Sequence, residues 1–156
     1  MWTITASAAL ESVVTLSVVT AGYSGTPLAG KIGIKEGHRV RLIGAPREWS
    51  IDDLPSNVKV FRRRTASPVE VAIAFYEDAA SLIRATGTLA EVITPDGSLW
   101  IAWPRRAAGH RSDITDHVVR SAVLPLGLVD VKVAALDENW SALKMVWRKE
   151  LRAKLR

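Results

Sequence analysis

The sequence predicts a single α/β domain with three layers, in which helices cover both faces of a mostly parallel sheet that ends in an antiparallel hairpin. Three observations carry this prediction. The chain has 156 residues, 48% of them hydrophobic and 24% charged, which is enough apolar material for one ordinary core. Short apolar runs alternate with segments of helical periodicity. Two strand-like runs follow each other near the C-terminal end, separated by a short polar turn.

The first half of the chain predicts short elements joined by loops rich in glycine and proline. Helices are expected at 28–32, just after Pro27, and briefly at 48–54, before Pro55. Strands are expected at 38–43, 58–61 and 69–76. The last of these is almost entirely apolar, as a strand buried on both faces of a parallel sheet should be, so we place it at the sheet centre.

The second half predicts two longer helices and three strands. Apolar residues recur with helical spacing over 78–93, where Pro95 is the expected stop, and over 113–124, where Asp113 is the expected N-cap. Between these helices, a turn at Asp96-Gly97 leads into a strand and then a polar loop. The strand is expected at 98–103, the loop at 105–112, and the final hairpin at 128–136 and 143–147, around a turn at 137–139.

This order, with parallel crossovers and one reversed strand near the edge, is that of a Rossmann-like domain and resembles the core of class I methyltransferases. Two short motifs support the resemblance. Pro95-Asp96-Gly97-Ser98-Leu99 looks like the turn before a late core strand of those enzymes, and Gly127-Leu128 looks like the entry to their final strand pair.

A more specific resemblance is carried by segments spread along the chain. They are Gly22-Tyr23-Ser24-Gly25-Thr26-Pro27-Leu28, Trp100 to Arg105, Asp113-Ile114-Thr115, Gly127 to Lys132, and Asp137-Glu138-Asn139-Trp140-Ser141. Together they make residues 22–148 look like the bacterial domain-of-unknown-function family 3052. The resemblance implies a Rossmann-like fold and supplies no catalytic residues, because the activity of that family is not established.

We therefore expect one Rossmann-like domain at 22–148, with an N-terminal extension at 1–21 and a basic tail at 149–156. The extension has neither the basic start of a signal peptide nor an unbroken apolar run that could span a membrane. The chain has no cysteine, which excludes a disulfide framework, a thiolate zinc site and a cysteine nucleophile. These features predict a cytoplasmic protein without membrane association.

The formal net charge is +5, and basic residues gather at 62–64, 105–111 and 148–156. Solvated faces and a basic terminal helix are the simpler interpretation of these clusters. A nucleic-acid surface is the alternative, and it predicts an affinity that falls steeply as the salt concentration rises.

A ligand site is expected at the carboxyl ends of the parallel strands, where open α/β sheets bind their ligands. In the predicted layout this edge gathers 44–47, 76–78, 103–106 and 137–140, with 23–26 folding over them. The candidate ligand-binding residues are Tyr23, Ser24, Gly25, Thr26, Gly44, Trp103, Arg105, Asp137, Glu138 and Trp140. An enzyme should have a deep pocket here lined by Tyr23, Trp103, Asp137 and Trp140, whereas a partner-binding module should have a flat apolar patch.

Two groups at this edge have alternative interpretations. Asp137 and Glu138 beside Trp140 suit an acid/base pair or a grip on a cationic group, and they equally suit a polar hairpin turn. Trp100 and Trp103 are three apart in a strand and should point to opposite faces, one into the core and the other toward the edge pocket.

The sequence matches the cofactor-binding motifs of this fold poorly. A dinucleotide or S-adenosylmethionine (SAM) site calls for a glycine-rich turn after the first strand and an acidic residue at the end of the second. Here Gly44 is followed by Ala45 and Pro46, and the second strand ends in Phe61 and Arg62. The motifs therefore disfavour SAM as a cofactor, while the arginines after the second strand leave a phosphate group as an alternative partner.

Metal and nucleophile chemistry have weaker support. Asp113 and His117, with His110 and Asp116 nearby, have a spacing that metals can use, but helix capping explains Asp113 more simply and no metal is predicted. No predicted strand precedes Ser24 as a nucleophile elbow requires.

The leading hypothesis is a non-catalytic or degenerate Rossmann-like domain that binds a small anionic or nucleotide-like ligand, or a protein partner, at the carboxyl edge of its sheet. The first alternative is a relative of SAM-dependent methyltransferases. The second alternative is nucleic-acid binding through the arginine clusters.

Overall fold

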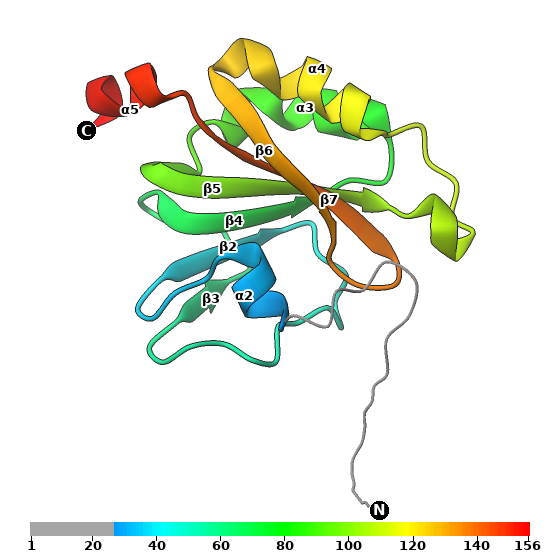
Figure 1. Ribbon diagram of the computed structural model, residues 1–156, viewed down its shortest axis with the longest axis horizontal. Helices are drawn as coiled ribbons and strands as arrows, with labels where there is room; N and C mark the ends of the chain where they lie inside the picture. The colour runs from blue at the N-terminus through cyan, green and yellow to red at the C-terminus, as the bar shows by residue number, and fades with distance from the viewer. Residues whose placement is uncertain (1–26) are drawn as a thin grey trace, which may run out of the picture.

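Six strands form one mixed sheet in the computed structural model, which describes residues 27–156 (Figure 1). The strands are β2 (Arg39–Ile43), β3 (Lys59–Phe61), β4 (Val69–Phe75), β5 (Ile93–Pro104), β6 (Leu128–Ala135) and β7 (Trp140–Trp147). The α-helices are α2 (Leu28–Ile32), α3 (Ala79–Leu89), α4 (Asp116–Val123) and α5 (Lys149–Leu155), with short 3-10 turns at Arg106–Ala108 and Leu124–Leu126.

The strand order is β3-β2-β4-β5-β7-β6. Strands β3, β2, β4 and β5 pair in parallel, and β7 runs antiparallel to both β5 and β6. This confirms the predicted α/β architecture, with a mostly parallel sheet that ends in an antiparallel hairpin. Strand β4 lies between β2 and β5, and six of its seven residues are buried, in agreement with its predicted place near the centre.

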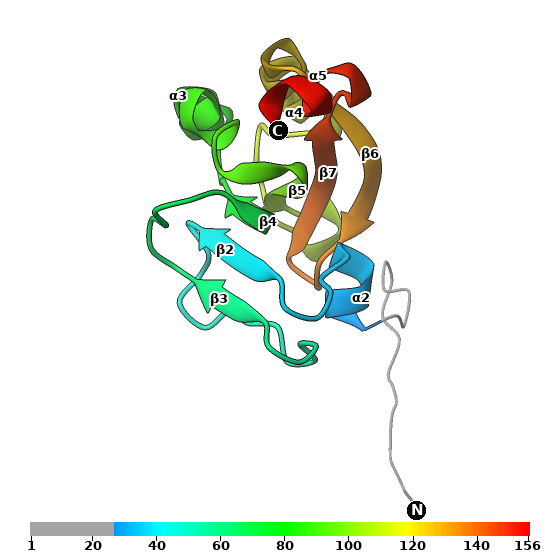
Figure 2. The same cartoon turned by 90° about the vertical axis from the view of Figure 1, so that its left-hand side faces the viewer.

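The two faces of the sheet carry separate cores, and helices lie against both faces (Figure 2). Helices α3 and α4 cover one face, where Leu82 and Leu89 of α3 and Val119 and Val123 of α4 are fully or almost fully buried. Helix α2 lies against the other face and buries Ala29 and Ile32. Below, these are called the α3 face and the α2 face.

The starts of the two longer helices are fixed by side-chain caps. The carboxylate of Asp78 accepts a hydrogen bond from Ser81 N at the start of α3, and Thr115 Oγ1 accepts one from Val118 N at the start of α4. The prediction that Asp113 caps its own helix is therefore wrong. Asp113 Oδ1 instead accepts from Ala79 N, 2.8 Å away, so this carboxylate satisfies a free N–H group of α3.

The boundary between α3 and β5 differs from the prediction. Helix α3 ends at Leu89 instead of continuing to residue 93, and Pro95 lies inside β5. The expected turn at Asp96-Gly97 is an irregularity within this strand, because Val69 pairs with Ile93 while Val71 pairs with Ser98. A Cβ on Gly97 would lie 2.8 Å from Glu70 O, so glycine allows the two backbones to approach here.

The predicted helix over 48–54 does not form. This segment is a loop whose Trp49 and Ile51 are buried in the α2-face core, so packing of two large apolar side chains determines its path. The basic tail forms helix α5, and Leu151 packs against the α3-face core. Within residues 27–156, no helix combines the length and the apolar character that a membrane crossing demands.

Candidate functional site

Segments distant in the sequence meet at the carboxyl ends of the parallel strands, as the topology predicts. The loop after β5 joins the β6–β7 turn, because Arg105 N donates to Asn139 O over 2.8 Å and the Arg105 guanidinium donates to the carbonyl oxygens of Asp137 and Glu138. The loop after β2 joins the same turn through Trp49 Nε1, which donates to Asp137 Oδ2 over 2.9 Å. Two of the predicted segments, 103–106 and 137–140, are therefore held together by hydrogen bonds, and the loop after β2 joins them through Trp49, just beyond the predicted 44–47.

A cavity of about 390 Å³ opens at this edge, on the α2 face. Its wall combines two indoles, two carboxylates and smaller side chains, from Leu28, Pro46, Glu48, Trp49, Ser50, Leu136, Asp137, Asn139 and Trp140. Phe75, at the end of β4, holds both indoles edge-on, with ring centroids 4.9 Å from Trp49 and 5.0 Å from Trp140. We call this space the edge cavity.

Asp137 organises the floor of the edge cavity. One carboxylate oxygen accepts from the backbone N–H groups of Asn139 and Trp140, and the other accepts from the Trp49 indole. The polar hairpin turn, one of the two interpretations of this segment, is therefore present. A carboxylate with three such donors is a positioning group for Trp49 and Trp140, whereas Glu48 is exposed at the cavity mouth.

The predicted site residues are brought together only in part. Asp137 and Trp140 line the edge cavity, Glu138 is exposed beside it, and Arg105 braces the turn. Gly44 has a φ of 68°, and its Cα approaches β4 so closely that an added Cβ would lie 3.0 Å from Phe75 O. Tyr23, Ser24, Gly25 and Thr26 lie outside the described residues.

The placement of Trp103 in the edge pocket is wrong. Trp100 and Trp103 do point to opposite faces of β5, and both are buried. Trp100 is on the α2 face, where its Nε1 donates to Ile32 O, while Trp103 packs into the α3-face core, away from Asp137 and Trp140.

Trp49 takes the place in the cavity wall that was predicted for Trp103, and sequence reasoning missed it. The signal was present in the sequence: Trp49 and Ile51 are large apolar residues in a segment bounded by Pro46 and Pro55, too short for a stable helix. Such residues in a loop are expected to bury themselves against a neighbouring face.

The usual cofactor position of this fold is occupied by the chain itself. Arg62, which stands where the acidic residue is expected, donates to the carbonyl oxygens of Pro46 and Trp49 and so clamps the loop after β2. Pro46 has no N–H to offer a ligand. The residues present therefore do not fit a cofactor held by the glycine turn and an acidic second strand.

Three of the four residues considered for a metal are engaged separately. Asp113 binds Ala79 N, Asp116 pairs with Arg120 at 2.6 Å, and His110 Nε2 lies 2.9 Å from Asn139 Oδ1. No group of three or more His, Asp or Glu residues within the described part of the chain is arranged to hold a metal ion.

Comparison with known proteins shows the fold. No family model and no curated protein matches the sequence. Similar solved structures include a SAM-dependent methyltransferase from Aquifex aeolicus, with a TM-score of 0.54 at 12% identity over 76% of this chain and 87% of that chain. Fibrillarin from Aeropyrum pernix, in complex with natively bound SAM, has a TM-score of 0.50 at 11% identity over 80% of this chain and 70% of that chain.

TrmN from Thermus thermophilus is also similar, with a TM-score of 0.50 at 9% identity over 78% of this chain. The chain spans about half, 47%, of the length of that protein. At such identities the likeness concerns the fold alone, so the chain is an α/β protein with the Rossmann-like fold of methyltransferases.

Proposed function

We propose that this protein is a methyltransferase relative that binds SAM or a closely related adenosine compound in the edge cavity. The observation that carries the proposal is the pairing of two indoles with two carboxylates at the carboxyl edge of a methyltransferase-like sheet. The structural neighbours support this alternative better than the non-catalytic hypothesis, which had been the leading one.

The chemistry of the edge cavity suits the parts of such a ligand. The indoles of Trp49 and Trp140 offer faces for stacking an adenine ring or for a sulfonium cation. Glu48 offers a carboxylate for ribose hydroxyls, which is the role that the acidic residue after the second strand has in other Rossmann-like sites. The volume lies within the range of small-molecule sites.

Calorimetric titration of the purified chain with SAM tests the proposal. We expect a dissociation constant near or below about 100 μM, which corresponds to roughly −5.5 kcal/mol. Glu48→Gln should weaken binding by about threefold to tenfold, because it removes the charge that accepts the ribose hydroxyls. Ligand stacking should also change tryptophan fluorescence, and Trp49→Phe should reduce that change.

Glu36→Gln is the matched control, since Glu36 is an exposed carboxylate that does not line the edge cavity. It should leave the affinity unchanged. Absence of heat with about millimolar SAM, in protein shown to be folded by circular dichroism, contradicts the proposal.

Two further assignments stay proposals. We propose that the chain is a member of the bacterial domain-of-unknown-function family 3052, on the motifs between residues 22 and 148 given above. We also propose a cytoplasmic location, because a chain without cysteine suits a reducing compartment.

A further inference from the structure

A second cavity, of about 520 Å³, lies on the α3 face of the sheet, away from the edge cavity. Strand β2 contributes Arg41 and Ile43, α3 contributes Ala85, Thr88 and Leu89, and the segment from Arg64 to Pro68 provides the opposite wall. Tyr76, Glu91 and Val92 complete it. We call this space the β2 groove. It shares no lining residue with the edge cavity.

Arg41 is the unusual residue of the β2 groove. Its Nε is buried, and among the described residues it has no hydrogen-bond partner. Native proteins seldom leave a buried charged donor unsatisfied, because such a group loses its water without gaining another partner. Because the buried Nε is out of reach, a carboxylate or phosphate in the groove would accept from the terminal Nη atoms of the same guanidinium.

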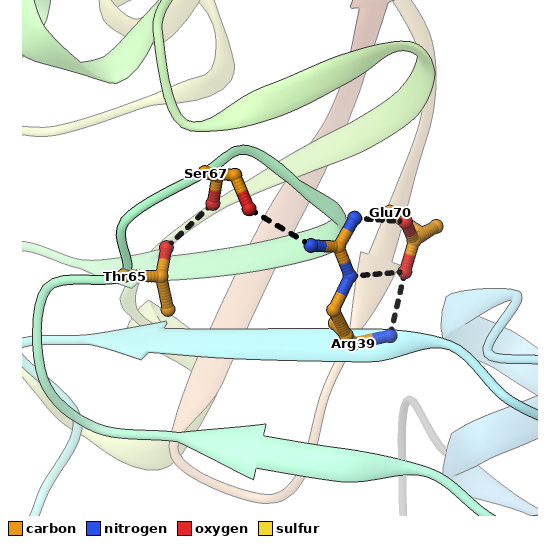
Figure 3. A network of polar contacts seen from close by, with 4 residues as sticks. All are labelled: Arg39, Thr65, Ser67 and Glu70. Atoms are coloured by element: carbon orange, nitrogen blue, oxygen red, sulfur yellow. Dashed lines mark hydrogen bonds and ion pairs between the residues drawn. The ribbon is translucent and has the colours of Figure 1, made fainter.

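The neighbouring arginine on the same strand differs from Arg41, because its guanidinium has hydrogen-bond acceptors from the chain. Arg39 is two positions before Arg41, on the same face of β2, and its guanidinium forms an ion pair with Glu70 at 2.7 Å and also donates to Ser67 Oγ (Figure 3). Both of its sides therefore have acceptors from the chain. Within residues 27–156, no residue provides the equivalent of Glu70 for the Nε of Arg41.

The same contacts tie one wall of the groove to β2. Arg39 holds Ser67, and Thr65 Oγ1 donates to Ser67 O over 2.8 Å, so residues 65–67 are fixed to β2 (Figure 3). Arg64, just before this segment, adds a second guanidinium to the lining, against the single carboxylate of Glu91. The groove thus has a preformed wall and an excess of positive charge.

We propose that the β2 groove binds a small organic anion, with its phosphate or carboxylate group on Arg41 and its apolar body against Ile43, Leu89 and Val92. The phenol of Tyr76 is a further donor in the lining, whereas the hydroxyl protons of Thr65 and Thr88 are donated to Ser67 O and Ala85 O. Burial raises the pKa of Tyr76 to about 12, so its phenol keeps the proton that it would donate. This site does not depend on the proposed function, because it lies on the opposite face of the sheet.

Calorimetric titrations of the full chain with phenyl phosphate and with benzoate test this proposal and separate the two sources of negative charge. We expect one of the two anions to bind, and Arg41→Met to weaken it about tenfold or more. Thr88→Trp should block the groove without changing its charge, because Thr88 is exposed at the mouth of the groove.

Arg111→Gln is the control for general electrostatic attraction, since it removes one charge from an exposed arginine outside the groove. It should leave the affinity unchanged, as should Glu48→Gln in the edge cavity. The proposal is overturned if neither anion gives heat, if Arg41→Met and the unchanged chain bind equally, or if Arg111→Gln weakens binding as much as Arg41→Met does. A failed SAM titration has no bearing on these outcomes.

Discussion

Arg41 costs stability, because its buried Nε has no acceptor within the part of the chain that the structure describes. Methionine keeps much of the length of the side chain and has no donor to satisfy. We therefore expect Arg41→Met to leave the free energy of unfolding unchanged or to raise it by up to about 1 kcal/mol, as is common where function opposes stability. Urea denaturation followed by circular dichroism measures this change.

Arg39→Met is the comparison for that experiment. It removes the ion-pair and hydrogen-bond partner of Glu70, so it should lower stability. If Arg41→Met were as destabilising as Arg39→Met, Arg41 would have a structural partner, and the anion site would lose its main support.

The ionisation of Glu70 should make the stability of the protein depend on pH. Burial by itself raises the pKa of Glu70, but the hydrogen bonds and the charge of Arg39 outweigh burial and hold this pKa below its ordinary value of 4.5. A carboxyl whose pKa is lower in the folded state stabilises fully above pH 4.5, and this contribution is lost as the pH falls through the folded-state pKa.

Glu70→Gln should therefore be less stable than the unchanged chain at about pH 6, and the difference should shrink toward about pH 3. Melting temperatures at a series of pH values measure it. A difference that stays constant over this interval would mean that the ionisation of Glu70 does not contribute to stability.

The orientation of a side chain could be predicted from the sequence where it depends on a single helix or strand. Alternation along β5 was enough to place Trp100 and Trp103 on opposite faces. The partner of Asp113 was not predictable in this way, because its acceptor oxygen binds the N-terminus of α3, 34 residues earlier in the chain. Arg41 was likewise missed, since only the assembled face shows that its Nε has no partner among residues 27–156.

At the scale of elements, two glycines can be compared, one where the backbones of two strands approach closely and one inside a helix. A Cβ at Gly97 would lie 2.8 Å from Glu70 O and 2.9 Å from Thr94 Oγ1, so the backbone of β4 or β5 would have to move. We expect Gly97→Ala to lower the free energy of unfolding by about 1–3 kcal/mol. Gly87 lies inside α3 with nothing within 4 Å of an added Cβ, so Gly87→Ala should raise it by about 0.5–1 kcal/mol.

Urea denaturation of the two variants tests this pair directly. Equal effects of the two substitutions would show that the irregular pairing of β4 and β5 tolerates a side chain. The same irregularity explains a failed prediction, because Pro95 and Gly97 have the composition of a turn while the chain continues as strand. The positions of proline and glycine in the sequence could not distinguish a turn from an irregular strand, since the difference depends on the pairing with β4.

At the scale of the molecule, the order of strands and helices was predictable. Each hydrophobic run had the apolar spacing of a helix or of a strand, and each was bounded by recognisable loop residues. The carboxyl edge followed from that order, and Asp137 and Trp140 line its cavity. The contribution of the loop after β2 did not follow, because Trp49 reaches the edge through packing against Phe75 instead of through regular structure.

The distribution of charge over the whole molecule bears on nucleic-acid binding. The arginines at 105–111 follow the carboxyl end of β5, whereas α5 follows the end of β7, which runs the opposite way, so the two clusters lie at opposite edges of the sheet (Figure 1). Several of these arginines are also engaged: Arg152 donates to Trp147 O and Arg156 pairs with Asp96. Residues 62–64 follow the carboxyl end of β3, which is parallel to β5, and so share the edge of 105–111, which means that one duplex would not meet all three clusters at once.

We therefore expect weak binding of duplex DNA or RNA at about 50 mM salt and none measurable at about 150 mM, with log K falling against log salt with a slope shallower than about −4. Fluorescence anisotropy with labelled duplexes measures this slope. A steep slope together with submicromolar affinity at about 150 mM salt would mean that the basic segments act as one surface, and a polyanion would then be the main partner of this fold. A shallow slope leaves the edge cavity and the β2 groove, on opposite faces of one sheet, as the proposed ligand sites.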